Sequence, residues 1–117
     1  MSQITQTHLR YLLAVYDLSR TVPAVGATEI AKALAVSKPS VTRMLGNLME
    51  KGLLVRERYG KVYLTDAGFL EAQEFRRRVD CLQKAFPAMG LDLTEEETLK
   101  AVLQLAAVLP ERAFTRR

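Results

Sequence analysis

The spacing of apolar positions between residues 28 and 51 predicts two helices that meet at a turn. In the first, Ile30, Ala31 and Leu34 fall on one face. In the second, apolar side chains recur at positions i, i+3, i+4 and i+7, which is the spacing of a helix with one buried face. These side chains are Val41, Met44, Leu45 and Leu48. The pattern therefore predicts a helix-turn-helix whose second helix covers residues 37–51.

Residues that favour helix ends agree with this interpretation. Thr28 is predicted to cap the first helix, with Glu29 in its first turn. Ser37 is predicted to cap the second, whose first turn tolerates Pro39. Gly52 is suited to the position just after the end of that helix.

The face opposite the apolar stripe of the second helix is polar, and its side chains can hydrogen-bond a base edge or a phosphate. We therefore expect this helix to enter the major groove of double-stranded DNA, while Thr28 offers its own helix N-terminus to a phosphate. The residues expected to meet DNA from the second helix are Ser37, Lys38, Pro39, Ser40, Thr42, Arg43 and Asn47.

A hairpin is predicted directly after this helix. Residues 53–58 and 61–64 read as strands, and Tyr59-Gly60 reads as a two-residue connection between them. The hairpin places Arg56, Arg58 and Lys61 near one tip, where we expect phosphate contacts. Six Lys and Arg stand against two Glu from Ser37 to Val62, a local excess of four that equals the formal net charge of the whole chain, +4.

Helical patterns also flank this unit. Residues 8–19 carry Leu9, Leu12, Leu13 and Tyr16 on one face, after a polar lead-in over residues 1–7. Beyond the hairpin, Thr65 or Asp66 is predicted to cap a long helix that reaches Phe86. Arg76, Arg77 and Arg78 point in three directions on that helix, so we expect solvated surface rather than a second DNA-binding patch.

The last predicted helix covers residues 95–109 and opens with a capping box at Thr94 and Glu97. Apolar residues cover most of its circumference, which a terminal helix in so small a chain can seldom bury alone. We therefore expect a second subunit to cover it, as a reader of palindromic DNA requires. The expected dimerisation residues are Leu99, Val102, Leu103, Leu105, Ala106 and Leu109. Residues 111–117 are expected to form a short tail.

The predicted fold class is mainly α (α+β), an N-terminal winged helix-turn-helix followed by a helical dimerisation domain. The expected ranges are residues 1–66 for the DNA-binding domain and 67–117 for the helical region, with a long helix over 67–86 and an apolar helix over 95–109. The segment around Pro87 to Leu93 is expected to be a connector.

Composition adds few constraints. A chain of 117 residues with 49% hydrophobic and 26% charged residues is typical of a globular domain. The single cysteine, Cys81, excludes an internal disulfide framework, and the sequence contains no membrane span, so we expect a cytoplasmic protein. One histidine and one cysteine on separate helices form neither a nucleophile–base pair nor a metal motif, so we expect no enzyme.

Four segments resemble the iron- and manganese-dependent repressors of the DtxR/MntR type. They are Tyr11–Tyr16, Ile30–Leu45, Glu50–Leu53 and Tyr63–Gly68. The resemblance implies a winged-helix domain, a helical dimerisation domain and repression of metal-uptake genes. The chain is similar to the short, manganese-type branch of the family, which lacks a C-terminal β-barrel.

The metal site that this resemblance implies is not matched by the residues present. The family uses two carboxylates on the first helix, a histidine on the long helix and a Glu-x-x-Glu-His cluster on the next. The corresponding positions hold Arg10, Leu13, Val79, Leu103, Ala106 and Ala107. None of these side chains ligates divalent manganese or iron, and a cationic Arg10 would oppose binding. We therefore expect no metal cofactor.

Two alternatives remain open on the sequence. The winged helix can serve as a protein-interaction module without DNA binding, or the regulator can still respond to a transition metal through an atypical site. Such a site would draw on His8, Asp17, Asp80 and Cys81. His8 by itself is expected to be a surface or cap residue, and Cys81 a partly buried helix residue.

Overall fold

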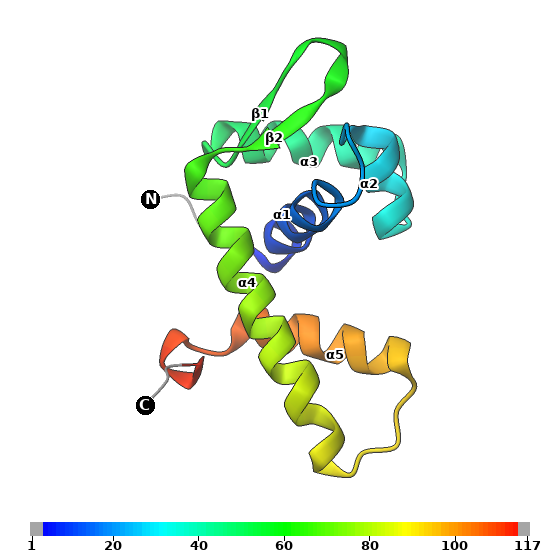
Figure 1. Cartoon of the computed structure of the whole chain (residues 1–117), viewed down its shortest axis with the longest axis vertical. Helices are drawn as coiled ribbons and strands as arrows, with labels where there is room; N and C mark the ends of the chain where they lie inside the picture. Colours follow the sequence, from blue (N-terminus) through cyan, green and yellow to red (C-terminus); the bar gives the residue numbers. More distant parts are fainter. Residues whose placement is uncertain (1–3, 115–117) are drawn as a thin grey trace. The chain divides into compact units, whose positions relative to one another are not determined.

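The computed structural model describes residues 4–114 and is mainly helical, with one two-stranded antiparallel sheet (Figure 1). In chain order the elements are α1 Gln6–Leu18, α2 Ala27–Leu34, α3 Lys38–Glu50, β1 Leu54–Arg56, η1 Arg58–Gly60, β2 Val62–Leu64, α4 Asp66–Ala85, η2 Phe86–Met89, α5 Glu95–Val108 and η3 Glu111–Phe114. This confirms the predicted fold class. Among the described helices, none is both long and apolar enough to cross a membrane.

Two compact units share the long helix α4. The first extends to Gln73 and the second begins at Glu74. The boundary predicted from the sequence, between residues 66 and 67, follows the wing and stays a prediction. The two units are described separately below.

The core of the first unit is formed by the apolar faces that the sequence predicted. α1 packs against α2, α3 and β2, and α3 packs against α2 and β1. Fully buried side chains come from each of these helices and from the wing, namely Leu12, Val15, Ile30, Val41, Leu45, Leu48 and Leu54. Met44, which was predicted on the buried face, is only half-buried.

α1 begins earlier than the sequence pattern indicated. Thr5 caps it, and its Oγ1 accepts a hydrogen bond from the His8 amide at 3.2 Å. The Thr5 amide donates in turn to Nδ1 of His8 at 3.0 Å, which completes a capping box. Burial, and then the charge of Lys51, lower the pKa of His8, which favours the neutral ring that this bond requires. The expected lead-in over residues 1–7 is wrong for Thr5 to Thr7, and residues 1–3 lie outside the described part of the chain.

The end of α3 follows the predicted glycine termination. Gly52 has a left-handed backbone with φ of 74°, and its amide donates to the Met49 carbonyl at 3.0 Å. The Leu53 amide donates to the Leu48 carbonyl, also at 3.0 Å. Both bonds satisfy carbonyls in the last turn of the helix and turn the chain towards the wing.

The wing is a hairpin whose connection is longer than predicted. β1 and β2 pair from Leu54–Leu64 to Arg56–Val62, so residues 57–61 lie between the strands. The amide of Glu57 donates to the Lys61 carbonyl at 2.7 Å, and the amide of Gly60 donates to the Glu57 carbonyl at 3.2 Å. The second bond closes a turn over residues 57–60 in which Tyr59 has a left-handed backbone, so Arg58 does not pair with Lys61 across the strands. The predicted two-residue connection is therefore wrong.

The junction between the wing and α4 depends on Thr65 and Gly68. The Thr65 hydroxyl accepts from the Gly68 amide at 3.0 Å and donates to the Gly52 carbonyl at 2.6 Å, which confirms Thr65 as the cap. The Thr65 amide also donates to the Leu53 carbonyl at 3.1 Å. A side chain at Gly68 would collide with that carbonyl, because its Cβ would lie 2.9 Å from the Leu53 carbonyl carbon and closer still to the oxygen. Glycine is thus required where α4 approaches the end of α3.

In the second unit, α5 begins at the predicted capping box. Thr94 Oγ1 accepts from the Glu97 amide at 3.1 Å, and the Glu97 carboxylate accepts from the Thr94 amide at 3.0 Å. The helix ends at Val108, one residue before the predicted end. The proline at 110, which cannot continue a helix, follows this end.

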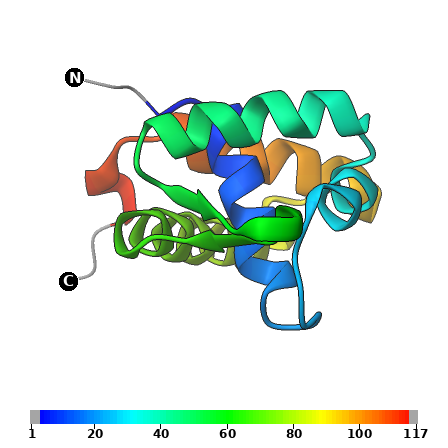
Figure 2. The ribbon, with the colours of Figure 1, turned by 90° about the horizontal axis from the view of Figure 1, so that it is seen from above.

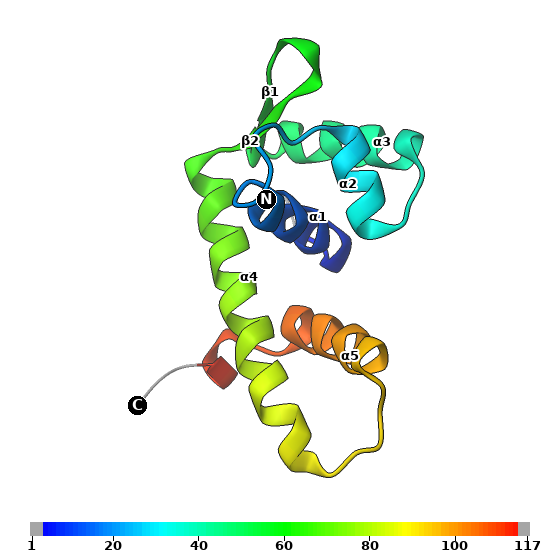
Figure 3. The ribbon, with the colours of Figure 1, turned by 45° about the vertical axis from the view of Figure 1, so that its right-hand side comes forward.

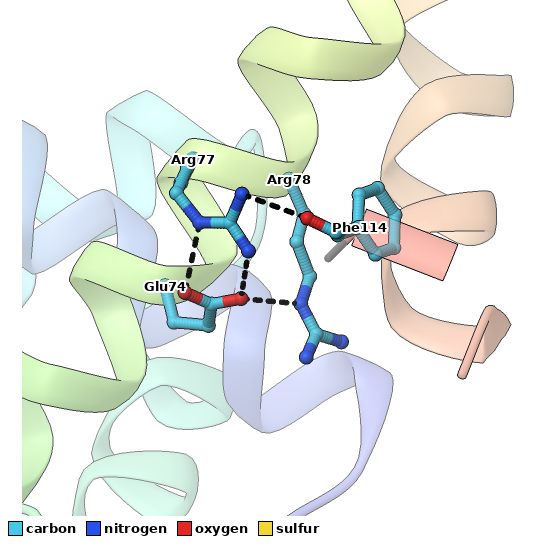
Figure 4. Close-up of polar contacts among 4 residues, drawn as sticks. All are labelled: Glu74, Arg77, Arg78 and Phe114. Atoms are coloured by element: carbon cyan, nitrogen blue, oxygen red, sulfur yellow. Dashed lines mark hydrogen bonds and ion pairs between the residues drawn. The ribbon is translucent and has the colours of Figure 1, made fainter. Parts of the chain in front are cut away.

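A polar network in the second unit holds the segment after α5 against α4 (Figure 4). The Glu74 carboxylate accepts from Arg77 at 2.7 and 3.0 Å and from Arg78 at 2.9 Å, and these bonds lower the pKa of Glu74 to about 2. Arg77 also donates to the Phe114 carbonyl at 3.3 Å, while the Arg78 guanidinium lies 5.1 Å from the centroid of the buried Phe114 ring. The expectation of a solvated arginine surface is therefore wrong for Arg78, whose side chain is only 17% exposed.

Candidate nucleic-acid interface

The start of α3 presents a short polar edge to solvent. Ser37 caps the helix as predicted, since its Oγ accepts from the Ser40 amide at 3.2 Å and lies 2.9 Å from the Ser40 hydroxyl. Lys38 and Pro39 occupy the first two helical positions, and both are exposed. The first turn of α3 therefore offers hydroxyl, ammonium and apolar ring groups side by side.

The two faces of α3 differ in the way that the sequence predicted. Thr42, Arg43 and Asn47 are exposed, whereas Val41 and Leu45 are fully buried. Within residues 4–114, the side chains of Lys38 and Arg43 form neither an ion pair nor a hydrogen bond. Both cations are consequently free to bind an external anion without breaking an internal contact.

α2 begins two residues earlier than predicted, so Thr28 does not cap it. Gly26 occupies the cap position, and its amide donates to Oε1 of Glu29 at 2.9 Å. The Glu29 carboxylate thus satisfies the amide of the cap residue from inside the helix, while Gly26 has no side chain that could accept from the first helical amides. Thr28 lies exposed in the first turn of α2, and its contact with a phosphate stays a prediction.

The wing is fixed to the start of α2. The Val62 amide of β2 donates to the Val25 carbonyl at 2.9 Å. A Cβ placed on Gly26 would lie 3.5 Å from the Gly60 carbonyl oxygen, so the two backbones are close there. These contacts place the wing, the start of α2 and α3 in one packed unit. Seen from above in Figure 2, α3 and the wing strands both lie toward the viewer, and Figure 3 shows the wing extending beyond α3 on the side away from α1.

The wing carries the predicted cations. Arg56 and Arg58 are exposed, and Lys61 is half-buried with its ammonium 5.3 Å from the centroid of the Tyr63 ring. The interaction with Tyr63, and then the charge of Glu57, raise the pKa of Lys61. The sequence analysis did not single out Tyr59, whose side chain is 99% exposed at the tip of the hairpin.

The residues predicted for dimerisation differ in how far they are buried within the single chain. Val102 and Ala106 are fully buried within the single chain, so their assignment to a surface for a second subunit is wrong. They sit on the one face of α5 that the chain itself covers. Leu99 is exposed, and Leu103, Leu105 and Leu109 are half-buried. These four leucines remain available to a partner.

The positions at which the resemblance implies metal ligands do not fit a divalent cation. Arg10 is exposed, and Leu13, Val79 and Ala106 are buried apolar side chains. Leu103 and Ala107 are half-buried and equally lack a donor atom. Among residues 4–114, no three His, Cys, Asp or Glu side chains lie close enough together to hold a metal.

The sequence of the first unit matches a known family of regulators. Residues 3–62, about half of the chain, match the family described as "Iron dependent repressor, N-terminal DNA binding domain". The chain is also similar to the transcriptional regulators MntR of Escherichia coli O6:H1 and Escherichia coli O157:H7. Each is 32% identical over 94 residues, which cover 76% of this chain and 61% of the relative. The chain thus spans about three fifths of the length of these curated relatives.

Solved structures share the fold. The manganese regulator SloR superposes with a TM-score of 0.76 at 22% identity, covering 94% of this chain and 50% of its own. ScaR, solved with bound Zn²⁺, superposes with a TM-score of 0.68 at 27% identity, covering 89% of this chain and 48% of its own. The likeness to SloR shows that this chain shares its fold over both units.

Proposed function

Because this chain belongs to the iron-dependent repressor family, we propose that it regulates transcription by binding double-stranded DNA as a homodimer, most simply as a repressor. The observation that carries the proposal is the exposed polar face of α3, which lies in one packed unit with a cationic wing. A helix of this kind fits the major groove, and a cationic hairpin beside it meets the phosphate backbone.

Different parts of the interface have different tasks in this proposal. Arg43 reads a base edge, for which a guanidinium paired with guanine is the commonest specific contact. Pro39 and the methylene of Ser40 pack against a thymine methyl group. Arg56 and Arg58 bind phosphates, which fix the register of the protein on the duplex without reading sequence.

A twofold partner is part of the proposal. The exposed Leu99 and the half-buried Leu103, Leu105 and Leu109 at the end of the helix supply apolar surface for this partner, beside the exposed Val108. Two copies joined through this surface present two α3 helices, and each reads one half of a palindromic operator.

We further propose that operator binding needs no metal. Ligand-driven activation requires that the metal bind one conformation of the dimer more tightly than another. The residues at the implied ligand positions offer no carboxylate or imidazole for such binding. Packing within the dimer, or a different signal, then holds the reading helices in place. The protein would act in the cytoplasm, where it meets its DNA.

Selection of genomic fragments by the purified chain tests the proposed function. Fragments that are retained should contain a palindromic sequence, and binding to it should weaken steeply as salt rises, because neutralised phosphates release counterions. Chelator should leave the affinity unchanged. Retention of no fragment above background, together with binding that does not depend on salt, would overturn DNA recognition and favour a protein-interaction module.

A further inference from the structure

The tip of the wing displays a tyrosine that the fold does not use. Tyr59 is 99% exposed, and it adopts a left-handed backbone with φ of 66° and ψ of 17°. In Figure 1 the η1 segment, Arg58–Gly60, forms the end of the hairpin, furthest from the helices of its unit. No hydrogen bond or ring contact involves the Tyr59 side chain within residues 4–114.

Neither the turn nor the core explains a tyrosine at this position. A left-handed backbone is favourable for glycine and tolerated by asparagine or aspartate, and an aromatic residue is strained there. The adjacent Gly60, with φ of 80°, shows the residue type that such a turn ordinarily takes. The ring also buries no surface within its own unit. A strained and fully exposed aromatic side chain is typical of a contact with a partner.

The surroundings of Tyr59 restrict that partner to a polyanion. Arg58 precedes it and Lys61 follows two residues later, while Arg56 ends the strand that leads into the turn. Glu57 is the only acidic residue between Arg56 and Lys61. The bond from Val62 to Val25 holds the hairpin against the start of α2, in the same packed unit as the reading face of α3.

We propose that Tyr59 is a DNA contact that reads the minor groove next to the major groove occupied by α3. Its ring packs against the sugar wall of the groove, and its hydroxyl donates a hydrogen bond to acceptors on the base edges. This inference rests on the proposed function, because it assumes that α3 binds duplex DNA. It assigns to the wing a preference for some base pairs over others, in addition to phosphate binding.

The chemistry of the minor groove defines the expected preference. A·T and T·A pairs present only acceptors there, whereas a G·C pair adds the amino group of guanine. A phenolic hydroxyl that donates to these acceptors is best accommodated where that amino group is absent. The wing should therefore favour A·T pairs at the positions it covers, outside those read by α3.

The experiment compares wild type with Tyr59→Asn and Tyr59→Phe on an operator selected by the wild-type protein. The pairs next to the sequence read by α3 are set to A·T, G·C or inosine·C. Inosine·C resembles G·C in the major groove, but its minor groove lacks the amino group. Wild type should bind the A·T and inosine·C duplexes about equally, and about tenfold more tightly than the G·C duplex.

The variants separate the ring from the hydroxyl. Tyr59→Asn should bind about tenfold more weakly than wild type and no longer distinguish the three duplexes. Tyr59→Phe should keep most of the affinity and lose most of the discrimination. Thermal unfolding should show that Tyr59→Asn is at least as stable as wild type, because asparagine tolerates the left-handed turn. Leu70→Asn, at an exposed apolar position on α4 outside the wing, is the matched control and should bind like wild type.

The outcomes distinguish this inference from the proposed function. Wild-type protein that binds no duplex in a salt-dependent way would overturn both. A second outcome is that wild type binds DNA and Tyr59→Asn binds it with the same affinity and the same discrimination among duplexes. This result would overturn the inference alone and leave a protein partner as the reason for the exposed ring. Equal weakening of Tyr59→Asn on all duplexes, with the A·T preference retained, would overturn the minor-groove assignment.

Discussion

At the scale of single residues, the interface contains two kinds of cation that differ in what surrounds them. Arg43 lies on the exposed face of α3, and the buried side chains on the opposite face fix the direction in which that exposed face points. Arg58 lies in the turn of the wing and is exposed. An arginine on the exposed face of α3 is placed for a base edge in the major groove, whereas one in the turn of the wing is placed for a phosphate.

This difference leads to a test with matched arginines. Arg43→Ala should cost about 1–3 kcal/mol of binding free energy on a selected operator and relax specificity at one position. Arg58→Ala should weaken binding to all duplexes about equally and reduce the salt slope by about one. Titrations of both variants on specific and non-specific duplexes at several salt concentrations measure these effects. Full operator affinity in Arg43→Ala would show that the reading helix is misassigned.

Caps show which residue-level features can be predicted from sequence. Ser37 was predictable because its hydroxyl serves an amide three residues away, which is a local relation. Thr28 was mispredicted because two local candidates for a cap competed within three residues. The start of α2 at Gly26 also involves a distant part of the chain, because the backbone of Gly60 lies close to Gly26. The cap of α1 was missed because a histidine takes the place of the usual Glu or Gln.

At the scale of elements, periodicity correctly predicted the buried face of α3 apart from Met44, and the capping box correctly predicted the start of α5. Both signals depend on residues within a few turns. The length of the wing connection and the role of Gly68 were not predictable in this way. Both depend on how β1, β2 and α4 meet the end of α3, through contacts between residues that are distant in sequence. Tyr59 belongs to the same group, because its exposure follows from the observed turn.

Gly68 provides a prediction about this junction. Gly68→Ala should lower the free energy of unfolding by at least about 2 kcal/mol, because the added methyl group meets the backbone of Leu53 and neither side can relax freely. Chemical denaturation followed by circular dichroism measures the change.

Gly46→Ala is the matched control for that substitution. Gly46 lies inside α3, and a Cβ there would meet no atom within 4 Å. This variant should gain about 0.5–1 kcal/mol, since alanine favours a helix interior over glycine. A Gly68→Ala variant as stable as Gly46→Ala would contradict the close approach of α4 to Leu53.

At the scale of the whole molecule, burial separates the apolar residues of α5 into two sets. Val102 and Ala106 are covered by the chain, and the sequence analysis assigned them to a partner because periodicity alone does not tell which of two apolar faces is inside. The prediction of a dimer therefore depends on Leu99, Leu103, Leu105 and Leu109. Leu99, which is 41% exposed, can be changed with little effect on the folded monomer.

The prediction for assembly follows from this choice of residue. Wild type should sediment as a dimer at micromolar concentration, and Leu99→Asp should weaken the dimer by at least about tenfold, because a carboxylate in an apolar contact is costly. Gln104→Asp introduces a carboxylate at an exposed polar position of the same helix and should leave the dimer intact. A monomeric wild-type protein would contradict the dimer, and with it the expectation of a palindromic operator.

The last prediction concerns the difference between this chain and the metal-responsive regulators that it resembles. Where the resemblance implies carboxylate and imidazole donors, the chain has Arg10 and a series of aliphatic side chains, several of them part of its core. In the second unit, the Glu74, Arg77, Arg78 and Phe114 network holds the segment after α5 against α4 through contacts of the chain itself. We therefore expect the operator-binding conformation to be independent of transition metals.

Calorimetric titration of chelator-treated protein with manganese, iron and zinc should detect no stoichiometric binding. Operator affinity should be the same with and without chelator, because a ligand shifts a conformational equilibrium only when it binds one state more tightly. His8→Gln and Cys81→Ser remove the imidazole and thiol donors of an atypical site, and both variants should bind DNA like wild type. One equivalent of metal bound tightly, with operator affinity rising alongside and lost in either variant, would contradict metal independence and identify the ligand.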